Sequence, residues 1–155
     1  MFGSLVVDHE AYVPRVATKD GRTTTPSLYV GDGLDQAALD RVATLFDPWT
    51  ARDLQAREAI AEDLARGTDG VVSAFVAFHR EELELDIVQR IFGAEPTDAL
   101  TALAQLDLVG VSVHADETSG FSLVFDYSFG PTVTDELLAV KFSPSGVVTC
   151  VAHES

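Results

Sequence analysis

The chain has 155 residues, the length of one ordinary domain. Hydrophobic residues make up 46% of it and charged residues 23%, so the composition excludes a chain that is disordered throughout or a collagen-like repeat. Acidic residues outnumber basic ones by 25 to 10, for a formal net charge of −15. Because binding to nucleic acids and to anionic membranes needs clustered Lys and Arg, we expect neither as a partner.

The negative charge is concentrated in the second half of the chain. Residues 1–78 hold 12 acids and 7 bases, net −5, whereas residues 79–155 hold 13 acids and 3 bases, net −10. Such a surface keeps a protein soluble, and that alone would account for it. The alternative interpretation is that the surface attracts a cationic partner.

The single cysteine, Cys150, excludes an intramolecular disulfide. It lies in the apolar run 147–152, so we expect it to be buried, with an unreactive thiol. The N-terminus lacks the basic segment of a signal peptide, and no apolar stretch approaches the roughly 18–20 residues that cross a bilayer. We therefore expect a cytoplasmic protein.

The first part of the chain predicts short extended segments. Residues 5–7, 12–16 and 27–30 have the composition of strands, and residues 19–22 that of a turn. Two helices are then expected. Asp35 caps the first, whose apolar stripe consists of Ala38, Leu39, Val42, Leu45 and Phe46. Thr50 caps the second, which Gly67 ends.

The third helix is expected to be the longest, from residues 68–69 to about residue 92, closed by Gly93. Its first half, residues 71–78, is apolar on nearly every side and should be buried. Its second half keeps an apolar stripe and exposes acids. A further short helix is expected over residues 96–105.

The last third of the chain has a period of two, which is typical of strands. Residues 108–115 and 121–129 form one predicted hairpin, and residues 137–143 and 147–153 form another. Successive hairpins favour an antiparallel sheet, and the helices precede it in the sequence. We therefore predict one α+β domain over residues 1–155, with a mainly antiparallel sheet and three to four helices packed on one face.

Alternation also predicts a polar face on this sheet. The side chains that point away from the core are expected to be Ser112, His114, Ser122, Asp126, Ser128, Leu137, Ala139 and Lys141. On it, His114, Asp126 and Lys141 could lie together: a histidine oriented by a carboxylate is a general base, and an ammonium stabilises an anion. No nucleophile accompanies them, which favours the alternative of a solvated face with an Asp126–Lys141 pair. The orientation of His153 stays open.

A second candidate site lies on the long helix. Spacings of three and four residues place His79, Glu82 and Asp86 on one side, where an imidazole and two carboxylates could hold a divalent metal. No partner motif on a facing helix accompanies them, which favours an exposed stripe or a ridge that faces a partner. We expect no cofactor, since residues 31–33 lack the glycine spacing and the lysine of a phosphate-binding loop.

Residues 71–84, together with residues 125–127, residues 135–142 and the terminal Glu154 and Ser155, resemble a family of small acidic bacterial proteins classed as a domain of unknown function. The resemblance covers most of the chain. It implies one compact domain and transfers no catalytic residue. In size and charge alone, the chain is also similar to bacterial immunity proteins that neutralise secreted toxins.

We therefore expect a non-enzymatic protein whose acidic surface binds another protein, for which a basic toxin or nuclease domain is a suitable partner. The contacts are expected to be exposed acids of the long helix, namely Glu81, Glu82, Glu84 and Asp86.

Two alternatives stay open. One is a small hydrolase or divalent-metal-dependent enzyme that uses either His79 with Glu82 and Asp86, or His114 with Asp126. The other is a homodimer that forms through the open sheet face, where Leu137 and Ala139 are expected to present apolar surface.

Overall fold

The structure is a computed structural model. It describes residues 16–17, 23–24, 27–47, 49–93 and 102–155. The predicted strand at 5–7, most of that at 12–16, the turn at 19–22 and the start of the helix at 96 lie outside these residues. Next to them, Val16–Ala17 (β1) pairs antiparallel with Thr23–Thr24 (β2).

The main sheet has five strands in the order β3-β4-β5-β6-β7. They are Ser27–Val30 (β3), Asp107–Asp116 (β4), Gly120–Ser128 (β5), Leu137–Phe142 (β6) and Val148–Glu154 (β7). β3 runs parallel to β4, and all the other neighbouring pairs are antiparallel. The two predicted hairpins are therefore confirmed as β4–β5 and β6–β7, and the fold class is α+β.

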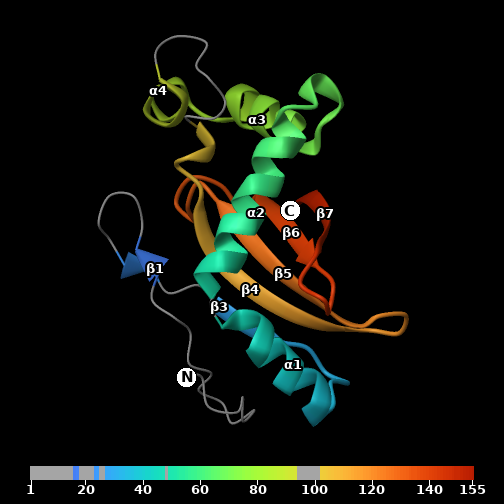
Figure 1. Ribbon diagram of the computed structural model, residues 1–155. Helices are drawn as coiled ribbons and strands as arrows, with labels where there is room; N and C mark the ends of the chain where they lie inside the picture. The colour runs from blue at the N-terminus through green and yellow to red at the C-terminus, as the bar shows by residue number, and fades with distance from the viewer. Residues whose placement is uncertain (1–15, 18–22, 25–26, 48, 94–101) are drawn as a thin grey trace.

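Two helices cross one face of the sheet (Figure 1). Gln36–Phe46 (α1) is capped as predicted, because the side chain of Asp35 accepts a hydrogen bond of 2.7 Å from the amide of Ala38. Trp49–Leu64 (α2) begins one residue before the expected cap at Thr50. Trp49 is partly buried and packs against the core. After α2, Gly67–Asp69 forms a short 3-10 helix (η1).

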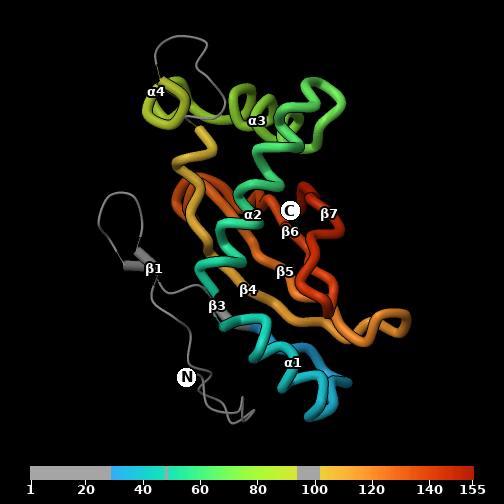
Figure 2. The backbone as a smooth tube through the Cα atoms, in the orientation of Figure 1, coloured from blue at the N-terminus to red at the C-terminus, as the bar shows by residue number. Residues whose placement is uncertain are grey.

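The predicted long helix is two helices, Val71–Glu82 (α3) and Leu85–Phe92 (α4), so that prediction was wrong. Figure 2 shows the helical path interrupted between them. Leu83 and Glu84 are extended, with ψ of 151° and 147°, and so end the first run of helical hydrogen bonds. Gly93 ends α4 with a φ of 81°, as glycine at this position commonly does.

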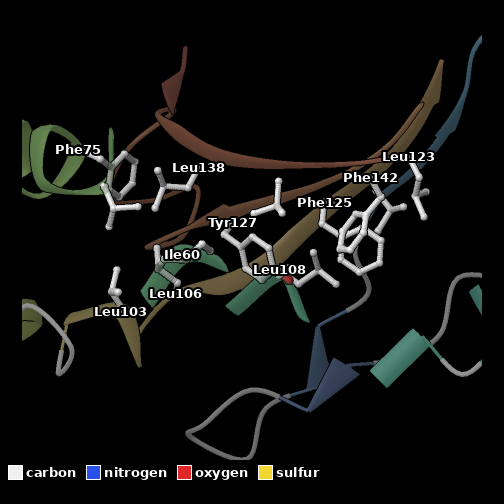
Figure 3. Packing of buried hydrophobic residues seen from close by; sticks show 14 of the residues in the cluster. Ile60, Phe75, Leu103, Leu106, Leu108, Leu123, Phe125, Tyr127, Leu138 and Phe142 are labelled. Carbon is white, nitrogen blue, oxygen red and sulfur yellow. The ribbon is translucent and has the colours of Figure 1, made fainter. Parts of the chain in front are cut away.

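The core lies between the helices and the inner face of the sheet (Figure 3). Figure 3 shows the buried side chains in one continuous layer, from Phe75 at one end to Leu123 at the other. The predicted inward residues of the two central strands are buried, namely Phe121, Leu123, Phe125, Tyr127, Leu138, Val140 and Phe142. The prediction that residues 71–78 are buried all round was wrong, since Ala74, Ala77 and Phe78 are exposed.

A polar contact fixes α2 against the sheet inside this layer. The hydroxyl of Tyr127 donates a hydrogen bond of 2.8 Å to Asp53, and Arg57 forms an ion pair of 3.1 Å with the same carboxylate. The Arg57 guanidinium also lies 5.0 Å from the centre of the Tyr127 ring and donates to the carbonyl of Leu106. Each buried polar group in this contact thus has a partner.

Candidate functional site

The four predicted contact acids are all exposed and lie at the break between α3 and α4, in a segment that we call the acidic junction: Glu81, Glu82, Glu84 and Asp86. Leu85 lies between these acids in the sequence and is 72% exposed. The sequence predicted all four acids on one helix. In the structure they lie at the end of α3, in the linking segment and at the start of α4. Leu85 is therefore an exposed apolar side chain flanked in the sequence by acidic residues.

Local hydrogen bonding and packing explain why these side chains face outward. The amide of Leu83 donates to the carbonyl of His79 and completes α3, and the amide of Val88 donates to the carbonyl of Glu84 and begins α4. Leu83 and Ile87 are partly buried and pack against the core. With these residues held inward, the acids and Leu85 remain on the solvent side.

The negative charge of the acidic junction is not offset by ion pairs with other residues that the structure describes. Within the described residues, none of its four carboxylates forms an ion pair or a hydrogen bond with a side chain. The neighbouring Arg80 places its guanidinium 5.1 Å from the centre of the Phe92 ring. Asp86, in the first turn of α4, is at the helix end that favours a negative charge.

The predicted metal group is not brought together. His79 is completely buried, whereas Glu82 and Asp86 are exposed and belong to different helices. Among the described residues, no group of three or more His, Cys, Asp or Glu side chains is arranged to hold a metal ion. The stripe was predicted on one continuous helix, and the break at Leu83 removes that geometry.

His79 instead belongs to a group that the sequence did not predict, which we call the histidine cluster: His79 of α3, His153 of β7 and Glu136 just before β6. His153 Nε2 lies 2.6 Å from Glu136 Oε2, at ion-pair distance but without the alignment of a hydrogen bond. His79 Nδ1 donates to the carbonyl of Phe75 over 2.8 Å, and its Nε2 has no hydrogen-bond partner among the described residues. His153 therefore faces the core, which settles the orientation that alternation left open.

The pKa of His79 is lowered from its ordinary value. Burial, which disfavours the charged imidazole, is the main cause, and the charge of His153 acts in the same direction. The hydrogen bond to Phe75 and the carboxylate of Glu136 oppose this shift. The lowered pKa favours the neutral imidazole, whose Nε2 is then a hydrogen-bond acceptor.

On the outer face of the sheet, the predicted residues share a face but do not form the predicted pairs. His114 Nε2 is 2.9 Å from the hydroxyl of Ser112, with no hydrogen bond to Asp126. Lys141 forms its ion pair with Glu154 at 2.9 Å, so the expected Asp126–Lys141 pair was wrong. The register explains this, because Asp126 lies opposite Ala139 and Lys141 lies opposite Val124.

Asp126 is the most perturbed carboxyl group on this outer face. Burial raises its pKa to about 6, and the nearby charge of Glu154 adds to the effect, while His114 and Lys141 oppose it. Gly110 lies opposite Asp126, and a Cβ at this glycine would lie 3.1 Å from Asp126 Oδ2. A carboxyl group of this kind can exchange a proton near neutral pH, but no nucleophile is hydrogen-bonded to it among the described residues.

Two expectations about apolar residues on this face were wrong. Cys150 is exposed, because a bulge between Lys141 and Phe142 lets both Val148 and Val151 face the core and leaves Cys150 outside. Ala139 is completely buried and Leu137 partly so. Ala139 therefore presents none of the apolar surface on which a homodimer was predicted, and Leu137 presents only part of its side chain.

One signal in the sequence does indicate that His79 is buried. Val72, Phe75, Val76 and His79 follow the spacing of a single helical stripe, and the first three are buried. His79 continues this stripe although its neighbours Arg80 and Glu81 are charged. Glu136 has no comparable signal, since it lies outside the strands and its contact with His153 depends on tertiary structure.

No protein-family model, curated protein or solved structure matches the chain. The resemblance to small acidic bacterial proteins therefore stays a prediction. In the part of the chain that the structure describes, no helix has both the length and the apolar character needed to span a membrane.

Proposed function

We propose that the chain is a non-enzymatic cytoplasmic binding protein that uses the acidic junction to hold a basic partner protein. One observation carries the proposal: four exposed carboxylates surround the break between α3 and α4, and the 72% exposed Leu85 lies among them. A contact of this kind combines an apolar anchor with charges that steer and orient the partner. Blocking the basic face of a toxin or nuclease is one function that such a contact would perform.

The chemistry of the surface supports a protein rather than a phosphate backbone as the ligand. Carboxylates repel phosphate groups, whereas Lys and Arg side chains of a partner protein complement them. Leu85 adds an apolar side chain, which contributes to binding when a protein surface covers it.

Leu85 allows an experiment with a matched control. Tagged wild-type protein, Leu85→Ala and Leu54→Ala are used to capture proteins from a lysate of the source cells at low and moderate salt. Leu54 is also exposed, at 59%, but lies on α2. Loss of an interface anchor reduces affinity by about tenfold or more.

The proposal predicts that one basic protein is captured in stoichiometric amount. Its binding should be weakened by moderate salt and by Leu85→Ala, but not by Leu54→Ala. If that protein binds all three chains equally, the acidic junction is not the binding surface. If no basic protein is captured, the partner class is wrong.

An enzyme that uses Asp126 is the second candidate, and the raised pKa of this carboxyl group favours it. A small hydrolase would use Asp126 as a general acid with His114 nearby on the same face. Its test is turnover of a panel of ester and phosphoester substrates, with Asp126→Asn as the inactive control. Equal turnover by wild type and variant would exclude this site.

A further inference from the structure

The histidine cluster lies where α3 packs against β7. Two imidazoles and one carboxylate meet there among phenylalanine rings. The His79 ring centre is 4.2 Å from that of Phe75 and 5.1 Å from that of Phe129, and His153 lies 5.1 Å from Phe75. Titratable groups are uncommon in such apolar surroundings, because a charge there loses its hydration.

The hydrogen bonding of the cluster suits a neutral His79. Its Nδ1–H donates to the carbonyl of Phe75, and its Nε2 is buried without a partner in the part of the chain that the structure describes. The only carboxylate of the cluster, Glu136, already lies against His153. A proton on His79 Nε2 would therefore create a buried charged donor, beside a second imidazole, with no acceptor within hydrogen-bond distance among the described residues.

We propose that the histidine cluster is an acid-sensitive latch: when His79 gains a proton, the C-terminal half of α3 is released from β7 and Phe129. Other charged residues of the neighbouring elements have partners elsewhere or are exposed. Arg80, next to it on α3, turns to the Phe92 ring, and on α4 both Asp86 and Arg90 are exposed. On β7, Glu154 is exposed and pairs with Lys141.

Of the charges on described residues that act on His79, the carboxylate of Glu136 favours its protonated form, whereas the charge of His153 and the burial of the ring oppose it. The folded pKa of His79 lies below its ordinary value of 6.5. Its contribution to stability is therefore present above pH 6.5 and is lost as the pH falls through the folded pKa. With one proton coupled, the opening equilibrium constant rises by at most about tenfold per pH unit in this range.

Release of α3 would also displace the acidic junction, since Glu81 and Glu82 end this helix. The consequence for partner binding rests on the proposed function, but the release itself does not. An experiment on the isolated chain consequently tests the latch whatever becomes of the binding proposal.

Hydrogen exchange measured on the full chain at about pH 7.5 and about pH 5.5, corrected for intrinsic rates, tests the latch. His79→Phe keeps an aromatic ring among Phe75 and Phe129 and removes the titrating nitrogens. His114→Gln is the matched control, because it removes an exposed histidine from the outer face of the sheet.

The latch predicts that acid raises the opening constant of residues 71–82 several-fold more than that of the β4–β5 hairpin in the wild type and in His114→Gln. In His79→Phe this difference should vanish. An equal rise in the two segments, or the same rise in His79→Phe, overturns the proposal.

If His79→Phe does not fold, the latch is tested in the wild-type chain by following the nitrogen-15 chemical shifts of the imidazoles as the pH is lowered. His79 Nε2 should then gain its proton over the same pH range in which residues 71–82 open. Protonation without opening, or opening while His79 is still neutral, overturns the latch.

Discussion

Tyr127 of β5 donates its hydroxyl hydrogen to Asp53 of α2 over 2.8 Å, and this bond joins the sheet to the longest helix. Tyr127 is completely buried. Burial and the Asp53 carboxylate raise the pKa of its hydroxyl, so the group remains a donor well into the alkaline range.

Tyr127→Phe removes this donor, so that Asp53 Oδ1 keeps only the longer hydrogen bond of 3.2 Å from Arg57 Nε. We expect the free energy of unfolding to fall by about 2 kcal/mol, the usual cost for a hydrogen bond to a charged group. Urea denaturation measures this change. Tyr29→Phe is the control, because Tyr29 is 58% exposed, and it should change stability by less than about 0.5 kcal/mol. Equal stabilities for Tyr127→Phe and the wild type would contradict this role.

Asp126→Asn should change how stability depends on pH. The folded pKa of about 6 lies above the ordinary value of 3.8, so the contribution of Asp126 to stability is present below about pH 4 and lost as the pH rises through 6. The asparagine variant should therefore exceed the wild type by about 1 kcal/mol at about pH 7.5, a modest gain because the carboxyl group is partly exposed. The advantage should vanish near pH 4.

Asp116 provides a control, because the pKa of its carboxyl group is shifted in the opposite direction to that of Asp126. Hydrogen bonds from the amides of Ser119 and Thr118 lower the pKa of its carboxyl group, so its contribution is present at neutral pH and is lost as the pH falls through the folded pKa. Asp116→Asn should therefore not gain stability at about pH 7.5. If both variants gain stability equally, the effect of Asp126→Asn comes from net charge and not from its site.

Cys150 should react in the folded protein. It is exposed on the outer face of the sheet, so a neutral alkylating reagent should modify one thiol per chain without denaturant. Mass spectrometry over time measures the extent. Modification only after unfolding would show that this face is covered.

Strand alternation predicted the sheet well because it depends on a local rule. Successive side chains of β5 point to opposite faces, and Phe121, Phe125 and Tyr127 are buried as that rule requires. The same rule left β7 undecided, because a bulge adds one residue and changes which side chains face inward. Register shifts of this kind are set by the partner strand.

The break in the long helix was missed because no residue near it is a helix breaker. Leu83 and Ile87 continue the apolar stripe, and neither Gly nor Pro lies between Val71 and Phe92. At the break, Leu83 and Glu84 adopt extended backbone angles, while Leu83 and Ile87 both stay packed on the core, as they could in a continuous helix. The candidate acids were therefore identified correctly as exposed, while their arrangement and the burial of His79 needed the tertiary structure.

Charge reversal tests the central claim, that the acidic junction binds a basic partner, most directly. Glu82→Lys with Asp86→Lys reverses two charges of this surface, and Glu58→Lys with Glu62→Lys makes the same change in net charge on exposed positions of α2. Affinity for the captured basic protein is measured at low salt for both double variants. We expect the junction variant to lose at least about tenfold more affinity than the α2 variant. Equal affinities of the two variants would contradict the account.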